Sequence, residues 1–166
     1  MNDKIRRTEI YEVLKTVDDP ELPSVSVFDL GMVHDVLVMQ NKVFVSMIPT
    51  FAGCPALDFI EANVIEAVEA LDWVTECHVE FSYKHIWSTD AITDVGKVQL
   101  RKHGVSPPPE NYSHGDEWTV DCPFCGSDYT SMDNVFGPTA CRSILYCKAC
   151  KNPFEAMKPV VRASVI

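Results

Sequence analysis

A chain of 166 residues is long enough for one ordinary hydrophobic core and a small second module. Its hydrophobic fraction of 46% and aromatic fraction of 10% are typical of a globular protein and exclude extensive disorder. The net charge of −10 is uneven, because residues 1–117 hold nine basic and twenty acidic side chains, whereas residues 118–166 hold five and four. So acidic a domain repels phosphate backbones, and we expect no nucleic acid as a partner.

The pattern of apolar residues excludes a membrane-spanning helix. No apolar run approaches the roughly 20 residues that a span requires, so we expect no membrane association. The first residues, Met1 to Arg7, lead into a charged amphipathic stretch without the apolar core of a signal peptide. We therefore expect a cytoplasmic protein. In such a reducing compartment, seven cysteines indicate metal or redox chemistry rather than a disulfide framework.

The first elements predicted along the chain are a helix and a β-hairpin. Apolar residues at helical spacing predict a helix over residues 3–17. Pro20 ends this helix, because proline disfavours helical geometry at the residue before it. Two β-rich runs over 33–39 and 43–48, separated by the turn residues 40–42, predict two paired strands.

The next elements are two helices with a strand between them. Apolar residues recur at steps of three and four over 55–71, and Pro55 suits the first turn, so this is the strongest predicted helix. Alternating apolar and polar residues predict a strand over 74–83. A further helix is expected over 90–103, closed by Gly104.

A proline-rich segment divides the chain. Three consecutive prolines from Pro107 favour an extended conformation, which predicts a linker over 107–117. Residues 1–106 before it combine helices and strands in a small α/β domain. Residues 118–166 after it have short apolar runs and many turn residues, so this β module needs a staple to fold. The expected fold class is therefore α+β.

Two Cys-x-x-Cys pairs provide that staple. They are separated by 21 residues, counted between the inner cysteines, and comprise Cys122, Cys125, Cys147 and Cys150. Two such pairs on separate turns bring four thiolates to one tetrahedral centre, which is typical of a zinc ribbon. Because all four ligands come from the protein, the predicted zinc is structural. Iron in a rubredoxin-like site and a pair of redox dithiols are the alternatives.

The remaining three cysteines need separate accounts. Cys77 lies in a predicted strand and is expected in the core. Cys141 is expected to be a small buried residue, with a spare or regulatory metal ligand as the alternative. Cys54 precedes Pro55 at the start of the strongest helix, where the helix dipole and free amides stabilise a thiolate. Gly53 allows a partner or an ion to approach this loop; a buried capping cysteine is the alternative.

Three carboxylates stand beside Pro20, contributed by Asp18, Asp19 and Glu21. We expect them to lie near Cys54 and to form an oxygen and sulfur site for iron. The alternative is a solvated turn that only ends the preceding helix.

Four short motifs occur in an order that resembles the SufT-like iron–sulfur cluster assembly domain. They are Asp19-Pro-Glu, Asp29-Leu-Gly-Met-Val, Thr50-x-x-Gly-Cys-Pro and Trp87-x-x-Asp. The linker prolines, both cysteine pairs, Phe136-Gly-x-Thr-x-Cys and Pro153-Phe-Glu follow. With these, nearly the whole chain resembles the PaaD family, a component of the bacterial phenylacetyl-CoA epoxidase system of aerobic phenylacetate catabolism.

The resemblance implies a fold and a role. It implies a two-layer SufT-like assembly domain over 1–106 and a zinc ribbon over 118–166. It also implies an accessory factor, without catalytic activity of its own, that matures the iron–sulfur or di-iron centres of the multicomponent phenylacetyl-CoA 1,2-epoxidase. The implied partners are the oxygenase and reductase subunits and iron–sulfur assembly proteins, and a homo-oligomer is compatible with this role.

The resemblance further implies the roles of single residues in the first domain. Cys54 is the reactive residue or transient ligand of iron or of a cluster, together with Asp19 and Glu21. The residues that frame this site are Thr50, Gly53, Trp87 and Asp90. A thiol enzyme that depends on Cys54 is one alternative, although no histidine stands at a recognisable spacing to act as its base. A zinc-ribbon docking subunit is the other.

Overall fold

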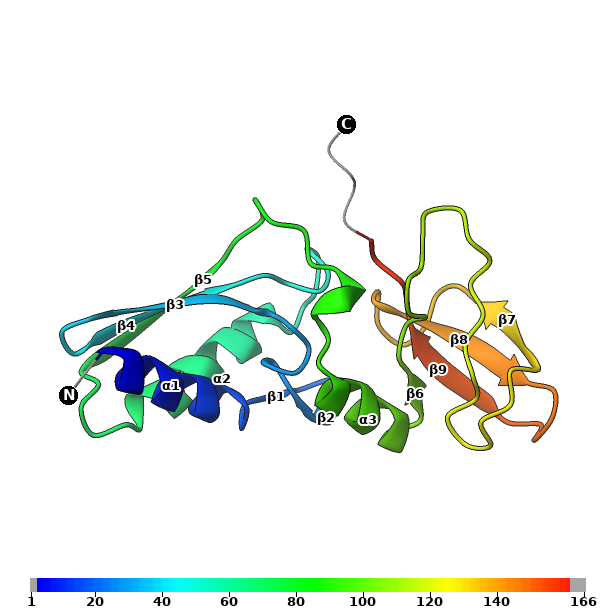
Figure 1. Cartoon of the computed structure of the whole chain (residues 1–166), viewed down its shortest axis with the longest axis horizontal. Helices are drawn as coiled ribbons and strands as arrows, with labels where there is room; N and C mark the ends of the chain where they lie inside the picture. The colour runs from blue at the N-terminus through cyan, green and yellow to red at the C-terminus, as the bar shows by residue number, and fades with distance from the viewer. Residues whose placement is uncertain (1–2, 162–166) are drawn as a thin grey trace. The chain divides into compact units, whose positions relative to one another are not determined.

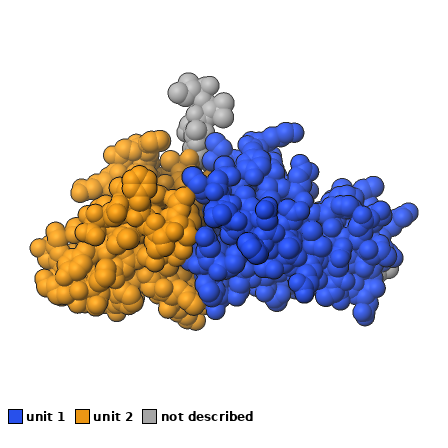
Figure 2. Space-filling model, turned by 180° about the vertical axis from the view of Figure 1, so that it is seen from behind, with its two compact units in different colours: residues 1–86 blue, residues 87–166 orange. Residues whose placement is uncertain are grey.

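The computed structural model describes residues 3–161 and divides into two compact units, residues 1–86 and 87–166 (Figure 2). The boundary between the two units lies between residues 86 and 87, and not within the linker expected over 107–117. Residues 87–106 belong to the second unit, where Val105 and Ser106 pair with a strand of the C-terminal sheet. Pro107 and Pro108 are buried, because they continue from this paired strand.

The first unit has two layers (Figure 1). Its sheet contains β3 (Val33–Met39), β4 (Lys42–Met47) and β5 (Glu76–Phe81) in that order. The hairpin partners β3 and β4 are antiparallel, whereas β4 and β5 are parallel. Helices α1 (Asp3–Leu14) and α2 (Leu57–Glu69) cover one face of the sheet. Since α2 connects β4 to β5, the loops that follow these two strands lie at the same edge of the sheet.

Burial in this unit follows the periodicities that predict its elements. On β4, Val43, Val45 and Met47 are buried, while the residues between them are only partly covered. On α2, Ile60, Val64 and Val68 are buried at helical spacing. The predicted hairpin, the strongest helix and the third strand are thus confirmed. No helix within residues 3–161 is long and apolar enough to cross a membrane.

The segment after α1 differs from its prediction. Helix α1 ends at Leu14, before the expected end at residue 17. Two short strands follow, β1 (Asp18–Asp19) and β2 (Leu22–Ser26), which pair as a small antiparallel ladder. The sequence predicts only a turn here, because a two-residue strand is too short to show a period of two.

The second unit begins with two short helices where one is expected. They are η1 (Thr89–Ala91) and α3 (Asp94–Lys102), so the helix predicted over 90–103 is wrong in its first turn. The break occurs because Thr93 caps α3: its Oγ1 accepts a hydrogen bond from the Gly96 amide (3.0 Å). Gly104, with a φ of +73°, follows the end of α3 as predicted.

A four-stranded sheet completes the second unit. It contains β6 (Val105–Ser106), β7 (Thr130–Asn134), β8 (Arg142–Cys147) and β9 (Pro153–Met157), in the order β6-β9-β8-β7. The core of its ribbon consists of Val120, Cys122, Leu145, Cys147, Phe154 and Ala156. Because two of these six are cysteines of the paired motifs, the core is small, as expected of a stapled module. The α+β class is confirmed.

Candidate functional site

The four cysteines of the paired motifs converge on one point of the ribbon. Their Sγ atoms all lie within 4.8 Å of one another. The Sγ atoms of Cys122 and Cys150 are 3.7 Å apart, and those of Cys125 and Cys147 are 3.6 Å apart. Zinc–sulfur bonds of about 2.3 Å in a tetrahedron place the sulfurs about 3.8 Å apart. The donor set therefore fits a metal ion with four protein ligands, a closed and structural centre.

Both cysteine pairs lie in turns of the same form. Cys122 O accepts a hydrogen bond from the Gly126 amide (2.8 Å), and Cys147 O accepts one from the Lys151 amide (2.9 Å). Gly126 has a φ of +73° and Lys151 a φ of +63°. The second pair lacks a glycine, so a lysine takes the left-handed conformation that glycine adopts without strain in the first. The ligand geometry is nevertheless preserved.

The thiols of this centre differ in acidity. Hydrogen bonding from the Asn152 side chain lowers the pKa of Cys150 to about 6. Burial raises the pKa of Cys122. A hydrogen bond from the Ser127 amide lowers the pKa of Cys125, but desolvation and the neighbouring thiols outweigh it and raise that pKa to about 12. A divalent cation replaces these protons when it binds, so metal affinity falls in acid.

The loop of Cys54 connects β4 to α2. The N-cap of α2 is Ala56, so Cys54 lies two residues before the cap rather than at it. Cys54 O accepts a hydrogen bond from the Leu57 amide (3.5 Å), which closes a turn through Pro55. The thiol is half-buried. The influence of the helix dipole is thus weaker than the sequence predicts, because it falls off beyond the first turn.

Other side chains gather at the same edge of the sheet. The Ser82 amide donates to Met47 O (2.7 Å), which places the loop after β5 beside the start of the Cys54 loop. His34, at the start of β3, and His85, in the loop after β5, have ring centroids 4.4 Å apart. No sequence pattern indicates this pair, because its members come from distant segments.

Gly53 and Thr50 belong to the Cys54 loop, as their motif requires. Thr50 is half-buried. A Cβ on Gly53 would lie 3.0 Å from the ring of Phe51, which is itself exposed. The glycine therefore lets the aromatic ring lie close against the backbone next to Cys54.

The carboxylates around Pro20 organise the β1–β2 turn. Asp19 is buried, and its Oδ1 accepts a hydrogen bond from the Glu21 amide (2.8 Å). Asp18 Oδ2 accepts one from the Ser24 amide (2.9 Å). Within residues 3–161, the four ribbon cysteines form the only group of three or more candidate ligand atoms this close together. Cys54, Asp19 and Glu21 do not form a preassembled three-ligand site.

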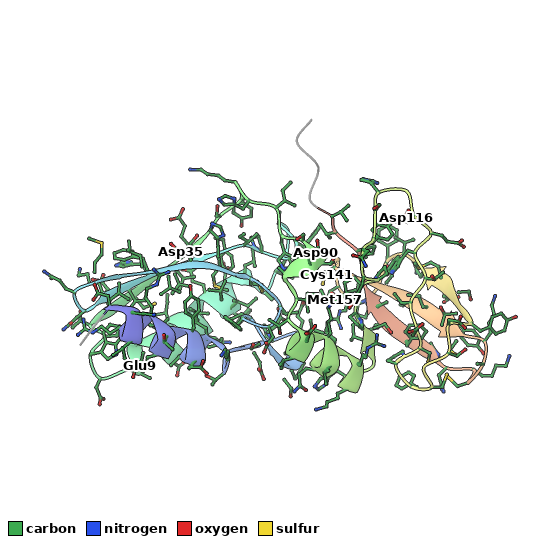
Figure 3. The ribbon with its side chains drawn as sticks, viewed as in Figure 1. Glu9, Asp35, Asp90, Asp116, Cys141 and Met157 are labelled. Carbon is green, nitrogen blue, oxygen red and sulfur yellow. The ribbon has the colours of Figure 1, made fainter. Side chains whose placement is uncertain are left out.

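The two residues expected to frame the site, Trp87 and Asp90, belong to the second unit; Figure 3 labels Asp90. Trp87 is buried, whereas Asp90, which lies on η1, is exposed. Cys77 is buried as expected. Burial, and then the charge of Glu69, raise the pKa of the Cys77 thiol to about 12.

Cys141, which we expected to be a small buried residue, is half-buried. It lies beside the end of β9, where its carbonyl accepts a hydrogen bond from the Lys158 amide (2.9 Å). Its Sγ is 3.2 Å from Thr139 Oγ1, which accepts a hydrogen bond from Arg142 Nε (2.8 Å). Polar neighbours keep the thiol at the surface of the ribbon.

Two family profiles match separate parts of the chain. Residues 7–81 match the family described as "Iron-sulfur cluster assembly protein". Residues 106–158 match the family described as "PaaD zinc beta ribbon domain". The first match covers most of the first unit, and the second contains all four clustered cysteines.

Relatives and a solved structure agree with these matches. A protein of Escherichia coli (strain K12), named as the D subunit of a "Putative 1,2-phenylacetyl-CoA epoxidase", is 34% identical, over 90% of this chain and 91% of its own. An "Fe-S protein maturation auxiliary factor" of Porphyromonas gingivalis is 35% identical, over 60% of this chain and 97% of its own. A crystal structure of a domain of unknown function from Bacillus anthracis is 28% identical, with a TM-score of 0.55, and covers 58% of this chain and 92% of that one.

Proposed function

The chain belongs to the PaaD family, and from this premise we propose that it is an accessory factor that matures metal centres of the multicomponent phenylacetyl-CoA 1,2-epoxidase. One observation carries the proposal: residues 7–81 match an iron–sulfur cluster assembly family, while nearly the whole chain is similar to a protein named as part of that epoxidase. A cluster assembly domain joined to a ribbon of the PaaD family fits a factor that supplies the iron–sulfur or di-iron centres of that enzyme.

Cys54 is the residue that holds the cargo, iron or an iron–sulfur cluster. Its half-buried thiol lies in a loop between β4 and α2, where a second protein can reach it. Because no third ligand atom of the described residues completes a site around it, the cargo would be bound incompletely and released readily. We propose that Asp19 and Glu21 contribute acidic groups and that Thr50 and Gly53 of the same unit frame the site. The framing role of Trp87 and Asp90, which belong to the second unit, stays a prediction.

The ribbon holds its own metal in this account. We assign zinc to Cys122, Cys125, Cys147 and Cys150, because four thiolates in tetrahedral arrangement suit it. Thiolates also bind iron in the same geometry, so metal analysis of the purified chain decides between the two. Zinc would hold the ribbon folded and take no part in cargo transfer.

We propose partners that the name of the relative in Escherichia coli supports. They are the oxygenase and reductase subunits of the epoxidase, together with the iron–sulfur assembly proteins that load the cargo. We propose that this transfer of iron or a cluster takes place in the cytoplasm. In this proposal residues 1–106 bind the cargo, residues 118–166 bind the partner proteins, and residues 107–117 connect the two. If the chain forms a homo-oligomer, a second copy would supply further ligands for the cargo.

Co-expression tests the proposed function. The epoxidase subunits are produced in cells that contain the native chain, the Cys54→Ser variant or no such chain, and the iron in each purified subunit is measured. We expect an iron-deficient subunit both without the chain and with Cys54→Ser, because the serine hydroxyl is a poor ligand for iron.

Cys141→Ser is the matched control, because Cys141 is also half-buried but lies in the ribbon outside the metal centre. It should support full iron loading. Equal iron content with and without the chain would refute the maturation role, and full loading with Cys54→Ser alone would refute the role of that cysteine.

A further inference from the structure

An apolar groove of about 610 Å³ opens on the second unit beside the metal centre. Its walls come from the end of α3, the first cysteine turn, the loop before β8, and strands β8 and β9. They consist of Lys102, His103, Gly104, Phe124, Pro138, Ile144, Pro153, Phe154 and Glu155. The groove contains no residue of the metal centre itself, and neither the maturation chemistry nor the ribbon fold requires it to be open.

Phe124 forms one wall and is fixed there by its neighbours. It lies between Cys122 and Cys125 in the chain, and the residue is 59% exposed. The ring packs against Gly104, because a Cβ at Gly104 would lie only 3.2 Å from Phe124 Cζ. The metal turn therefore holds an aromatic side chain in place at the groove while leaving most of it available to a ligand.

The free charge beside the groove is positive. Lys102, in the last turn of α3, is an exposed residue of the lining, and no carboxylate within residues 3–161 forms an ion pair with it. Glu155 is the acidic residue of the lining, but its Oε2 accepts a 2.6 Å hydrogen bond from Arg142. Arg142 thus neutralises it. The unpaired charge of the lining is therefore that of Lys102, on a chain of net charge −10.

We propose that this groove docks an acidic segment of the protein that the chain serves. An apolar side chain of the segment packs against Phe124 and Ile144, and a carboxylate of the segment faces Lys102. Charge complementarity selects an acidic segment over a basic one, since the ammonium group of Lys102 repels like charge. The identity of the partner rests on the proposed function, but the chemistry of the groove does not.

Binding of the purified oxygenase and reductase subunits to the full metal-loaded chain tests the proposal. We expect one of them to bind the native chain, with an affinity that weakens as salt rises. Phe124→Ala should weaken that affinity by about tenfold or more, as for a central aromatic of an interface. Lys102→Glu should weaken it comparably and should reduce its dependence on salt.

Phe136→Ala is the matched control, because Phe136 is an exposed aromatic of the same ribbon that does not line the groove. It should bind like the native chain. The metal content of Phe124→Ala shows whether that substitution disturbs the cysteine turn. If it does, the charge-reversal variant tests the groove independently, because it leaves the turn unchanged. Three results would each overturn the proposal. They are native affinity in the charge-reversal variant, failure of the native chain to bind either subunit, and occupation of the groove by a second copy of the chain.

The two proposals fail separately. Normal binding by the groove variants would refute the docking proposal and leave the maturation proposal intact. Iron loading that is independent of the chain, combined with lost binding in the groove variants, would refute the maturation proposal and support the docking proposal.

Discussion

The cysteines of this chain show how one side chain takes different roles in different surroundings. Cys77 is buried in the sheet, and its pKa rises to about 12. Cys150 accepts a hydrogen bond from Asn152 in the metal centre, and its pKa falls to about 6. Cys54 remains half-buried in a loop. Burial and hydrogen-bond donors, rather than residue type, thus separate the inert thiol from the metal ligand.

Thiol alkylation at pH 8 should distinguish these residues. We expect Cys54 and Cys141 to be modified in the native chain and Cys77 to remain unmodified, because burial keeps its thiol protonated. The pKa of Cys77 in the folded chain exceeds the unfolded value of 9.0. The contribution of this thiol to the free energy of unfolding is therefore complete below about pH 9 and is lost as the pH rises toward about 12. Mass spectrometry of the peptides measures the modification; rapid labelling of native Cys77 would contradict this account.

Among the elements, those with a long periodic pattern could be predicted from sequence. Helix α2 and strand β4 place their buried residues at steps that the sequence displays. Strands β1 and β2 could not be predicted, since β1 has two residues and its pairing depends on the tertiary position of β2. The break before α3 had a local signal in the capping residue Thr93, which apolar spacing alone overlooks.

Gly137 lies where the backbone of its loop passes close to the backbone at the start of β8. A Cβ there would lie 2.7 Å from Arg142 O, a backbone atom at the start of β8. We expect Gly137→Ala to reduce the free energy of unfolding by about 1–3 kcal/mol, because the strand must shift to admit the methyl group. Denaturant unfolding of the metal-loaded chain measures this loss.

Gly53→Ala is the control for that measurement. Its added Cβ meets the flexible ring of Phe51 at 3.0 Å, and this exposed ring can move aside. It should therefore cost much less stability. Equal losses in the two variants would show that the contact with Arg142 O does not determine the cost.

At the scale of the whole molecule, the sequence predicted the metal centre better than the cargo site. The spacing of two cysteine pairs defines the centre locally, and four sulfurs do converge. The association of Cys54 with Asp19 and Glu21 depends on the placement of separate loops, and their ligand atoms do not converge into one group. The groove could not be predicted at all, because it joins Gly104 to Phe124 across the fold.

Metal removal should unfold one part of the chain and spare the other. A structural zinc contributes on the order of 10 kcal/mol to a small metal-dependent domain, and the hydrophobic cluster of the ribbon is small and includes two of the metal-binding cysteines. A strong chelator should therefore abolish amide hydrogen-exchange protection in β7, β8 and β9, while β3, β4 and β5 of the first unit remain protected. Protected ribbon strands in metal-free protein would contradict a structural role for the metal.

The central claim is that Cys54 carries iron or a cluster to another protein. The most direct measurement is anaerobic reconstitution of the native chain and of Cys54→Ser with iron and sulfide, followed by transfer to the iron-free reductase or oxygenase subunit. We predict that the native chain loads the subunit with iron, and that Cys54→Ser, with its ribbon metal intact, does not. Equal iron transfer by both chains would contradict the account.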